Sequence, residues 1–277
     1  MNEVVTRFPI AMAVLLMVSC AAPMPRTDDP HETFNRKMYA FNDYVDRVAI
    51  RPVAQAYRTA TTQSMRRMIS NFFANIETPI TIGNELLQAR PKDALLGTCR
   101  LAINTTVGVL GFFDPASKIG IQRDETDFGI TLAKWGVPDG PYLVLPFYGS
   151  TSARDIWSLP IDTYFFDPLY YYSSGHHFVL EAQYAPTVLY LITLRSSAID
   201  AEGLVEGAYD PYIFYRDAYR QRRIYKIYEG DPPPEVIRAL QGDNEIDADE
   251  LLEEQRQYEQ KQKSQDDKKA SDAGGNF

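Results

Sequence analysis

The segment Asp29-Pro-His-Glu-Thr-Phe-Asn-Arg-Lys-Met-Tyr-Ala-Phe-Asn-Asp-Tyr-Val-Asp-Arg-Val-Ala-Ile50 is the strongest local indication of the fold. Asp29 before Pro30 is typical of a helix N-cap followed by proline in the first turn. Apolar residues then recur at intervals of four, three, four and three, the stripe of an amphipathic helix: Phe34, Met38, Phe41, Val45 and Val48. Pro52 disfavours helical angles at Arg51, so we expect the helix to end there.

The same periodicity continues downstream and predicts a mainly α-helical protein. We expect further helices over 64–76, 80–89, 91–106, 126–135, 151–163, 178–203 and 210–228. Pro91 and Pro211 stand at predicted helix starts, where the missing N–H is tolerated. No repeat or linker interrupts residues 29–230, so we expect one helical domain there.

Residues 136–149, Gly-Val-Pro-Asp-Gly-Pro-Tyr-Leu-Val-Leu-Pro-Phe-Tyr-Gly, differ from the helices on either side. They hold three glycines and three prolines around an apolar centre with β propensity. Glycine and proline at this density favour a loop or a short hairpin.

The N-terminal residues are typical of export. Arg7 precedes an apolar run over residues 8–19, which is shorter than a membrane-spanning helix. The run ends in Met17-Val-Ser-Cys20-Ala-Ala, which resembles a bacterial lipobox with Met17 in place of the usual Leu. We therefore predict a lipoprotein signal peptide over 1–19, lipidation at Cys20 and a tether over 20–28. The alternative is an ordinary cleavable signal that contains a buried cysteine.

Charge is concentrated at the C-terminal end. Of a formal net charge of −9, −6 lies in residues 243–277. The rest of the chain is nearly neutral, so nucleic-acid binding has no electrostatic support. We expect residues 231–277 to be an acidic, largely disordered tail, because they are polar and poor in aromatics.

Residues for catalysis do not form a recognisable set. The chain has no Gly-x-Ser-x-Gly nucleophile motif and no Walker-type glycine loop. Its three histidines are His31 and the adjacent pair His176-His177. Neighbouring histidines without carboxylates at ligand spacing make a poor metal site. We therefore predict no enzyme, no cofactor and no metal.

Two further groups have alternative explanations. Asp124, Glu125 and Asp127 form a carboxylate cluster that would suit a cation, but a helix N-terminus also favours negative charge. Cys99 lies among apolar residues of a predicted helix, where we expect it to pack in the core.

Aromatic and apolar residues are unusually concentrated in three segments. Residues 164–172 hold six aromatic side chains in nine positions, and tyrosine favours the membrane–water boundary. Segments 100–113 and 186–199 are apolar over more than one helical face, which indicates either a large core or lipid contact. An acyl chain at Cys20 would favour lipid contact.

An ordered series of motifs over about residues 28–228 resembles the VacJ/MlaA family of outer-membrane lipoproteins. The motifs include Asp29-Pro30, Phe41-Asn42, Arg51-Pro52, Asn71-Phe72-Phe73, Asn84-Glu85, Gly108-Val-Leu-Gly111, Asp127-Phe128-Gly129, Gly140-Pro141-Tyr142, Leu145-Pro146, Arg154-Asp155 and Asp210-Pro211-Tyr212.

The resemblance implies a ring-like helical protein in the inner leaflet of the outer membrane, lipid-anchored on the periplasmic side, with an amphipathic central channel. Such proteins remove phospholipids mislocalised to the outer leaflet, pass them to a periplasmic carrier (MlaC-like), maintain lipid asymmetry and associate with trimeric porins.

The resemblance also implies a channel and a gate, for which we expect Gly136 and Gly140 to act as hinges because glycine tolerates large backbone changes. The full set of expected channel and gating residues is Phe41, Asn42, Gly136, Gly140, Pro141, Tyr142, Leu143, Leu145 and Pro146. Two alternative functions remain open: a lipid-modifying, phospholipase-like lipoprotein enzyme, and a structural porin-associated envelope lipoprotein.

Overall fold

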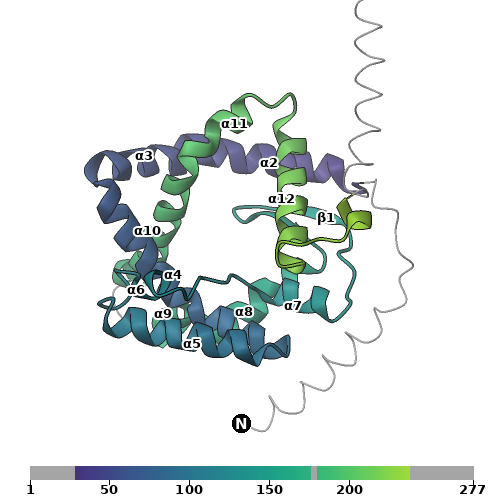
Figure 1. The fold of residues 1–277 in the computed structure, drawn as a ribbon. Helices are drawn as coiled ribbons and strands as arrows, with labels where there is room; N and C mark the ends of the chain where they lie inside the picture. The colour runs from purple at the N-terminus through teal and green to yellow at the C-terminus, as the bar shows by residue number, and fades with distance from the viewer. Residues whose placement is uncertain (1–28, 176–179, 238–277) are drawn as a thin grey trace, which may run out of the picture. The chain divides into compact units, whose positions relative to one another are not determined.

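The computed structural model describes residues 29–175 and 180–237 (Figure 1). Residues 29–227 form one compact unit, and residues 228–237 belong to a second one. Several predictions lie outside the described residues: the signal peptide, lipidation at Cys20, the tether, the pair His176-His177, and the tail beyond residue 237.

The unit over residues 29–227 is mainly helical and ring-like, as predicted, with its helices arranged around a four-sided frame (Figure 1). In chain order they are α2 (Glu32–Val45), the π-helical turn η2 (Asp46–Ile50), α3 (Arg51–Ala60), α4 (Gln63–Leu87), α5 (Pro91–Thr106), α6 (Pro115–Lys118), α7 (Phe128–Lys134), β1 (Tyr142–Leu145), β2 (Gly149–Ser152), the 3-10 turn η3 (Asp155–Trp157), α8 (Ser158–Phe166), α9 (Pro168–Gly175), α10 (Leu180–Ala198), the 3-10 turn η4 (Ile199–Ala201), α11 (Glu202–Glu206) and α12 (Pro211–Ile227).

The predicted helix end at Arg51 is wrong, because α2 continues through η2 directly into α3. The Arg51 N–H donates to the Asp46 carbonyl, five residues back, which is the bonding of a π turn. Pro52 then occupies the first turn of α3, where no N–H is needed. The start also differs, since His31 rather than Asp29 is the N-cap residue of α2.

The two helices predicted over 64–76 and 80–89 are one helix, α4, with Pro79 inside it. Proline in a helix interior costs roughly 3 kcal/mol. Packing of α4 along α5 offsets this cost, since these two helices form the most extensive contact between elements of the structure. The prediction failed because local propensity is weaker than packing at this position.

The predicted hairpin over 136–149 is confirmed, although it extends further. Strands β1 and β2 pair antiparallel from Tyr142 opposite Ser152 to Leu145 opposite Gly149. The helix predicted from residue 151 therefore begins later, because residues 151–152 belong to β2. A two-stranded hairpin is marginal by itself, so its position depends on what it contacts.

Burial in residues 29–227 is inverted relative to a water-soluble domain. Buried polar residues are more numerous than buried apolar ones, and many large apolar side chains are exposed. Helix α5 is typical: its buried residues are Ala94, Arg100 and Asn104, whereas Leu95 and Leu96 are exposed. Cys99 lies on the exposed face, so the prediction of core packing is wrong. Among the described helices, none combines the length and hydropathy needed to cross a bilayer.

Candidate functional site

Helix α2 holds the hairpin through two asparagine side chains that mimic a neighbouring strand. The Asn35 amide donates to the Tyr142 carbonyl (3.0 Å) and accepts from the Val144 N–H (2.9 Å). Asn42, two helical turns further along α2, repeats this pattern by donating to the Leu145 carbonyl (2.9 Å) and accepting from the Phe147 N–H (2.8 Å). The free edge of β1 is thus satisfied by side chains, as buried backbone groups require.

The tip of the hairpin carries exposed apolar side chains. Phe147 is 76% exposed and has a positive φ of 63°, which is uncommon for a residue other than glycine. Its ring packs edge-on against Phe41 of α2, with 5.3 Å between ring centroids. Pro146 and Tyr148 on either side are also exposed. The tip is therefore an apolar surface that α2 holds in place.

Strand β1 also contributes to a small aromatic core. Tyr142 and Val144 are buried and form a cluster with Tyr212 of α12. The Tyr142 hydroxyl and Ser150 Oγ lie 2.7 Å apart, and burial is the main reason why the pKa of Tyr142 is raised. The body of the hairpin is consequently held both by the α2 asparagines and by this cluster, and the tip is its most exposed part.

Both predicted hinge glycines have positive φ, 88° at Gly136 and 69° at Gly140. At Gly140 an added Cβ would also lie 2.9 Å from the Ala153 Cβ. Both the positive φ and this close contact therefore disfavour a larger residue at position 140. Proline requires a φ of about −65°. Substitution by proline would therefore distort these turns instead of locking them, and the hinge remains a prediction.

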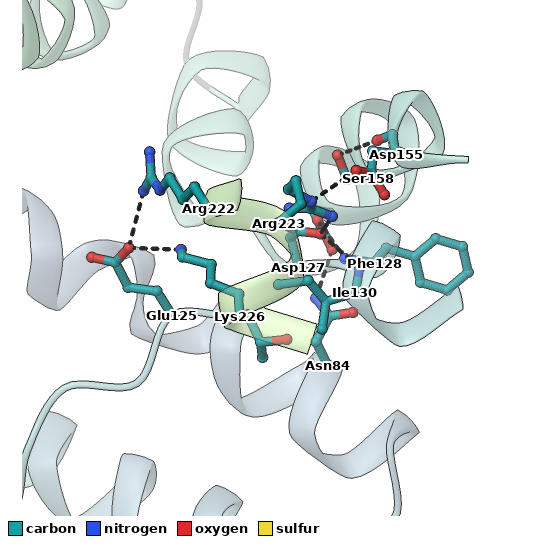
Figure 2. Close-up of polar contacts among 12 residues, drawn as sticks. Asn84, Glu125, Asp127, Phe128, Ile130, Asp155, Ser158, Arg222, Arg223 and Lys226 are labelled. Carbon is teal, nitrogen blue, oxygen red and sulfur yellow. Dashed lines mark hydrogen bonds and ion pairs between the residues drawn. The ribbon is translucent and has the colours of Figure 1, made fainter. Parts of the chain in front are cut away.

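A buried ionic network supports the base of the hairpin (Figure 2). Arg223 of α12 pairs with both oxygens of Asp127 (2.5 and 3.0 Å) and, through Nε, with Asp155 Oδ2 (2.7 Å). Arg154 pairs with Asp155 (2.8 Å) and with Asp139 (2.8 Å) in the segment leading to β1. Burial alone would raise the pKa of Asp155, but the charges of Arg223 and Arg154 outweigh burial and lower it.

A second buried hub joins α4, α7 and α8. Asp162 accepts hydrogen bonds from Asn84 Nδ2 (2.7 Å) and from the Phe128 N–H (3.0 Å), while Thr131 donates to Asn84 Oδ1 (2.8 Å). Burial, the largest cause, raises the pKa of Asp162 to about 6. Buried polar side chains thus link α4, α7 and α8 in the interior of the unit.

Each carboxylate of the cluster at 124–127 has a partner within the protein. Asp127 caps α7 by accepting from the Ile130 N–H (3.0 Å), Asp124 pairs with Arg90 (3.2 Å), and Glu125 pairs with Lys226 (2.9 Å; Figure 2). Within residues 29–175 and 180–237, no group of three or more His, Cys, Asp or Glu is placed to hold a metal ion. The helix N-terminus explains Asp127.

The structure brings most of the predicted site residues together. Phe41 and Asn42 contact the segment from Leu145 to Phe147, and Pro141, Tyr142 and Leu143 precede it in the same hairpin. Gly136 stands apart, at the end of α7. Sequence reasoning missed the anchoring role of Asn35. Asn35 and Asn42 are seven residues apart, which is two turns and the same face of a helix.

We expect Asn42→Ala to loosen the hairpin tip without unfolding the protein. The substitution leaves the Phe147 N–H without its acceptor, and one lost hydrogen bond of this kind costs about 1 kcal/mol, roughly fivefold in an equilibrium. Amide hydrogen exchange should therefore accelerate at Phe147 by about that factor. The Val144 amide, held by Asn35, serves as the internal control. Equal acceleration at both amides would contradict independent anchoring.

A family model for the MlaA lipoprotein matches residues 27–226. The Escherichia coli (strain K12) protein named "Intermembrane phospholipid transport system lipoprotein MlaA" is 35% identical over 253 residues, which cover 87% of this chain and 97% of that protein. A Rickettsia typhi protein is 38% identical over 196 residues, covering 70% of this chain and 76% of its own length.

The fold is also similar to a solved structure. A chain from "Structural basis for maintenance of bacterial outer membrane lipid asymmetry" superposes with a TM-score of 0.61 at 35% identity, covering 72% of this chain and 99% of its own length. Nearly the whole of that solved chain therefore has a structural equivalent in this protein.

Proposed function

This chain belongs to the MlaA lipoprotein family, and from that premise we propose that it is an outer-membrane lipoprotein of intermembrane phospholipid transport. In this role it removes phospholipids mislocalised to the outer leaflet and so maintains the lipid asymmetry of the membrane. The proposal agrees with the names of its relatives and, independently, with the distribution of polar and apolar residues in the structure.

The inverted burial pattern is the observation that carries the proposal. Monomeric soluble proteins rarely expose large contiguous apolar patches, whereas here each of three segments exposes four large apolar or aromatic side chains. They are the turn after α5 (Val107, Val109, Leu110, Phe113), helices α8 and α9 (Tyr164, Phe165, Tyr171, Tyr172) and helix α10 (Val188, Leu189, Leu191, Leu194). We assign these segments to contact with lipid.

The turn after α5 shows the pattern most clearly. Val109 and Leu110 are exposed and have positive φ, an uncommon and strained conformation for such residues. On either side of this turn in sequence, the largely buried Arg100 pairs with Asp114 (2.7 Å), and the buried Asn104 donates to the same carboxylate (3.0 Å). Apolar side chains are thus exposed here while charged and polar ones are buried, which is the reverse of the usual arrangement in a water-soluble protein.

The polar interior suits a phospholipid headgroup. Moving a charged headgroup through hydrocarbon is costly, because its hydrogen bonds to water are lost. A ring whose inner wall offers polar side chains and whose outer face is apolar lowers that cost without any bond chemistry. In this proposal lipid passes through the ring, and the hairpin tip beside Phe41 and Asn42 gates the passage.

The remaining parts of the proposal concern anchoring and partners. Acylation of Cys20 would tether the protein to the periplasmic side of the outer membrane and help seat the ring in the leaflet. Lipid removed from the outer leaflet must then cross water, so a periplasmic carrier of the MlaC type is the expected recipient. A trimeric porin is the expected membrane partner.

We expect that cells lacking this protein expose more phospholipid on their surface than the parent. A membrane-impermeant amine-reactive probe measures this exposure, and a plasmid copy should restore the parental value. The Cys20→Ala protein should restore it only partly, because sorting and seating are impaired. An unchanged outer leaflet would reject the transport function, and release of fatty acid from labelled phospholipid by the purified protein would favour an enzyme.

A further inference from the structure

A partly open pocket lies away from the hairpin, between α4, α5 and the segment between α6 and α7. Its volume is about 80 Å³, which accommodates on the order of five water-sized groups. Thr78, Thr81 and Glu85 line it from α4, and Gln122 and Asp124 line it from the segment after α6. Leu96 of α5, which is half exposed, forms part of its apolar margin.

The carboxyl group of Glu85 is the unusual feature of this pocket. Its side chain is 1% exposed, and its Oε2 atom has no hydrogen-bond partner among the described residues. Burial, and next the negative charge of Asp124, raise the pKa of Glu85 to about 7. Glu85 and Asp124 line the same pocket, and although Asp124 has Arg90 as a partner (3.2 Å), no donor reaches Glu85 Oε2. A buried carboxyl oxygen without a donor favours a proton or a cation beside it.

The cations around the pocket are already engaged by acids other than Glu85. Arg100 pairs with Asp114 (2.7 Å), and Arg123 pairs with Glu77 (3.2 Å). Arg90 pairs with Asp93 (2.8 Å) and, more loosely, with Asp124 (3.2 Å). The charged groups that face Glu85 from the surrounding elements are Arg90, Asp93, Arg100, Arg123 and Asp124. None of the ion pairs in the described residues includes Glu85, so the pocket retains an unmet preference for positive charge.

We propose that this pocket binds a primary ammonium group, placed between the carboxylates of Glu85 and Asp124. An ammonium has three N–H donors, which matches two carboxylate oxygens plus a hydroxyl or amide oxygen from Thr78, Thr81 or Gln122. The described residues supply no set of three ligating groups for a metal ion here. A quaternary ammonium would bring charge but no donor.

The source of the ammonium is either a phospholipid headgroup, which rests on the proposed function, or a free amine. Binding must displace the proton that the two carboxyls otherwise share. The affinity should therefore rise with pH as Glu85 ionises, and binding at low pH should release a proton. A site that requires protonated Glu85 would instead lose affinity as the pH rises.

The test is calorimetric titration of the full-length protein in lipid nanodiscs at pH 6 and pH 8. With the pKa of Glu85 at about 7, its ionised fraction rises from about one tenth to about nine tenths over this range. Ethanolamine and glycerophosphoethanolamine should therefore bind about tenfold more tightly at pH 8. At pH 6, each binding event should release close to one proton, measured from the dependence of the heat on the buffer.

Glu85→Gln is the decisive variant, because its amide replaces the shared proton by donating to Asp124 and so preserves the fold. It should lose both ammonium binding and proton release. The control is Glu235→Gln, which makes the same charge change at an exposed position and should bind as the parent does. Glycerophosphocholine should bind at least tenfold more weakly than glycerophosphoethanolamine, because it lacks N–H donors.

Tighter binding of glycerophosphoethanolamine than of ethanolamine supports a lipid headgroup as the ligand, and equal binding supports a free amine. Equal binding of choline and ethanolamine compounds, binding independent of pH, unchanged binding by Glu85→Gln, or no binding of any amine would each overturn the inference. Surface phospholipid in cells carrying Glu85→Gln is measured separately. If the parent protein binds no ammonium compound but cells carrying it keep normal lipid asymmetry, the inference about the pocket is rejected and the proposed function is unaffected.

Discussion

Replacing Arg223 by methionine should lower the free energy of unfolding by about 3–5 kcal/mol. The guanidinium lies between Asp127, the N-cap residue of α7, and Asp155 of η3, and it joins both to α12. Tyr219 of α12 also donates to Asp155. Methionine keeps much of the volume but leaves two carboxylates without this partner. Removing one member of a buried ion pair is expensive because the remaining charge stays desolvated. Chemical denaturation of the purified protein in detergent measures the change.

The adjacent Arg222 provides a matched control on the same helix. Its side chain is 70% exposed and lies 3.5 Å from Glu125 (Figure 2). An exposed pair contributes at most about 1 kcal/mol, so Arg222→Met should change stability little. Similar losses for the two variants would show that the network around Asp155 does not hold the unit together as argued.

Deleting Phe41 and Asn42 together should have the largest functional effect. Each helical residue turns the chain by about 100°, so the deletion rotates the part of α2 before Phe41 by about 200° relative to the part after Asn42. The hairpin tip loses its contacts with Asn42 and with the ring of Phe41. If the Asp46–Arg195 ion pair holds the later part of the helix in place, the earlier part is the one that turns, and Asn35 can then no longer reach β1. Failed removal of lipid and uncontrolled leakage both raise surface phospholipid, so we expect an increase in either case.

The double substitution Phe41→Ala and Asn42→Ala is the control for this deletion. It removes the contacts to the tip but keeps the helical register, so Asn35 still holds the body of the hairpin. Surface phospholipid measured with the amine-reactive probe should rise less than in the deletion. Parental asymmetry in the deletion strain, with the protein present at normal amounts, would show that α2 and the hairpin do not gate the passage.

Local patterns were reliable where a short stretch of chain decides its own conformation. The apolar stripe of α2, the proline at the start of α5 and the glycine after α7 all act within one or two helical turns. The hairpin was predictable for the same reason, since the turn residues over 136–149 exclude a helix. Local patterns failed at Pro52 and Pro79, because the π turn of η2 and the packing of α4 on α5 make a helix tolerable at positions where propensity alone forbids it.

The polar site residues illustrate a different limit. Asn42 was predicted as a site residue through a family resemblance, whereas the role of Asn35 emerged only from its bonds to β1, 107 and 109 residues away in sequence. Contacts over such separations depend on how α2 and the hairpin come together. No window of sequence contains both partners.

The chain's pattern alone thus established a mainly helical protein with one Gly/Pro-rich hairpin and a series of motifs of one family. It did not establish which face of each helix is buried, because apolar periodicity marks a face without saying whether protein or lipid covers it. In α5 the buried side is the polar one, with Arg100 and Asn104 inward and Leu95 outward. That inversion, and with it the Glu85 Oε2 atom that has no hydrogen-bond partner among the described residues, results from the packing of the assembled ring, where buried polar groups contact one another across elements distant in sequence.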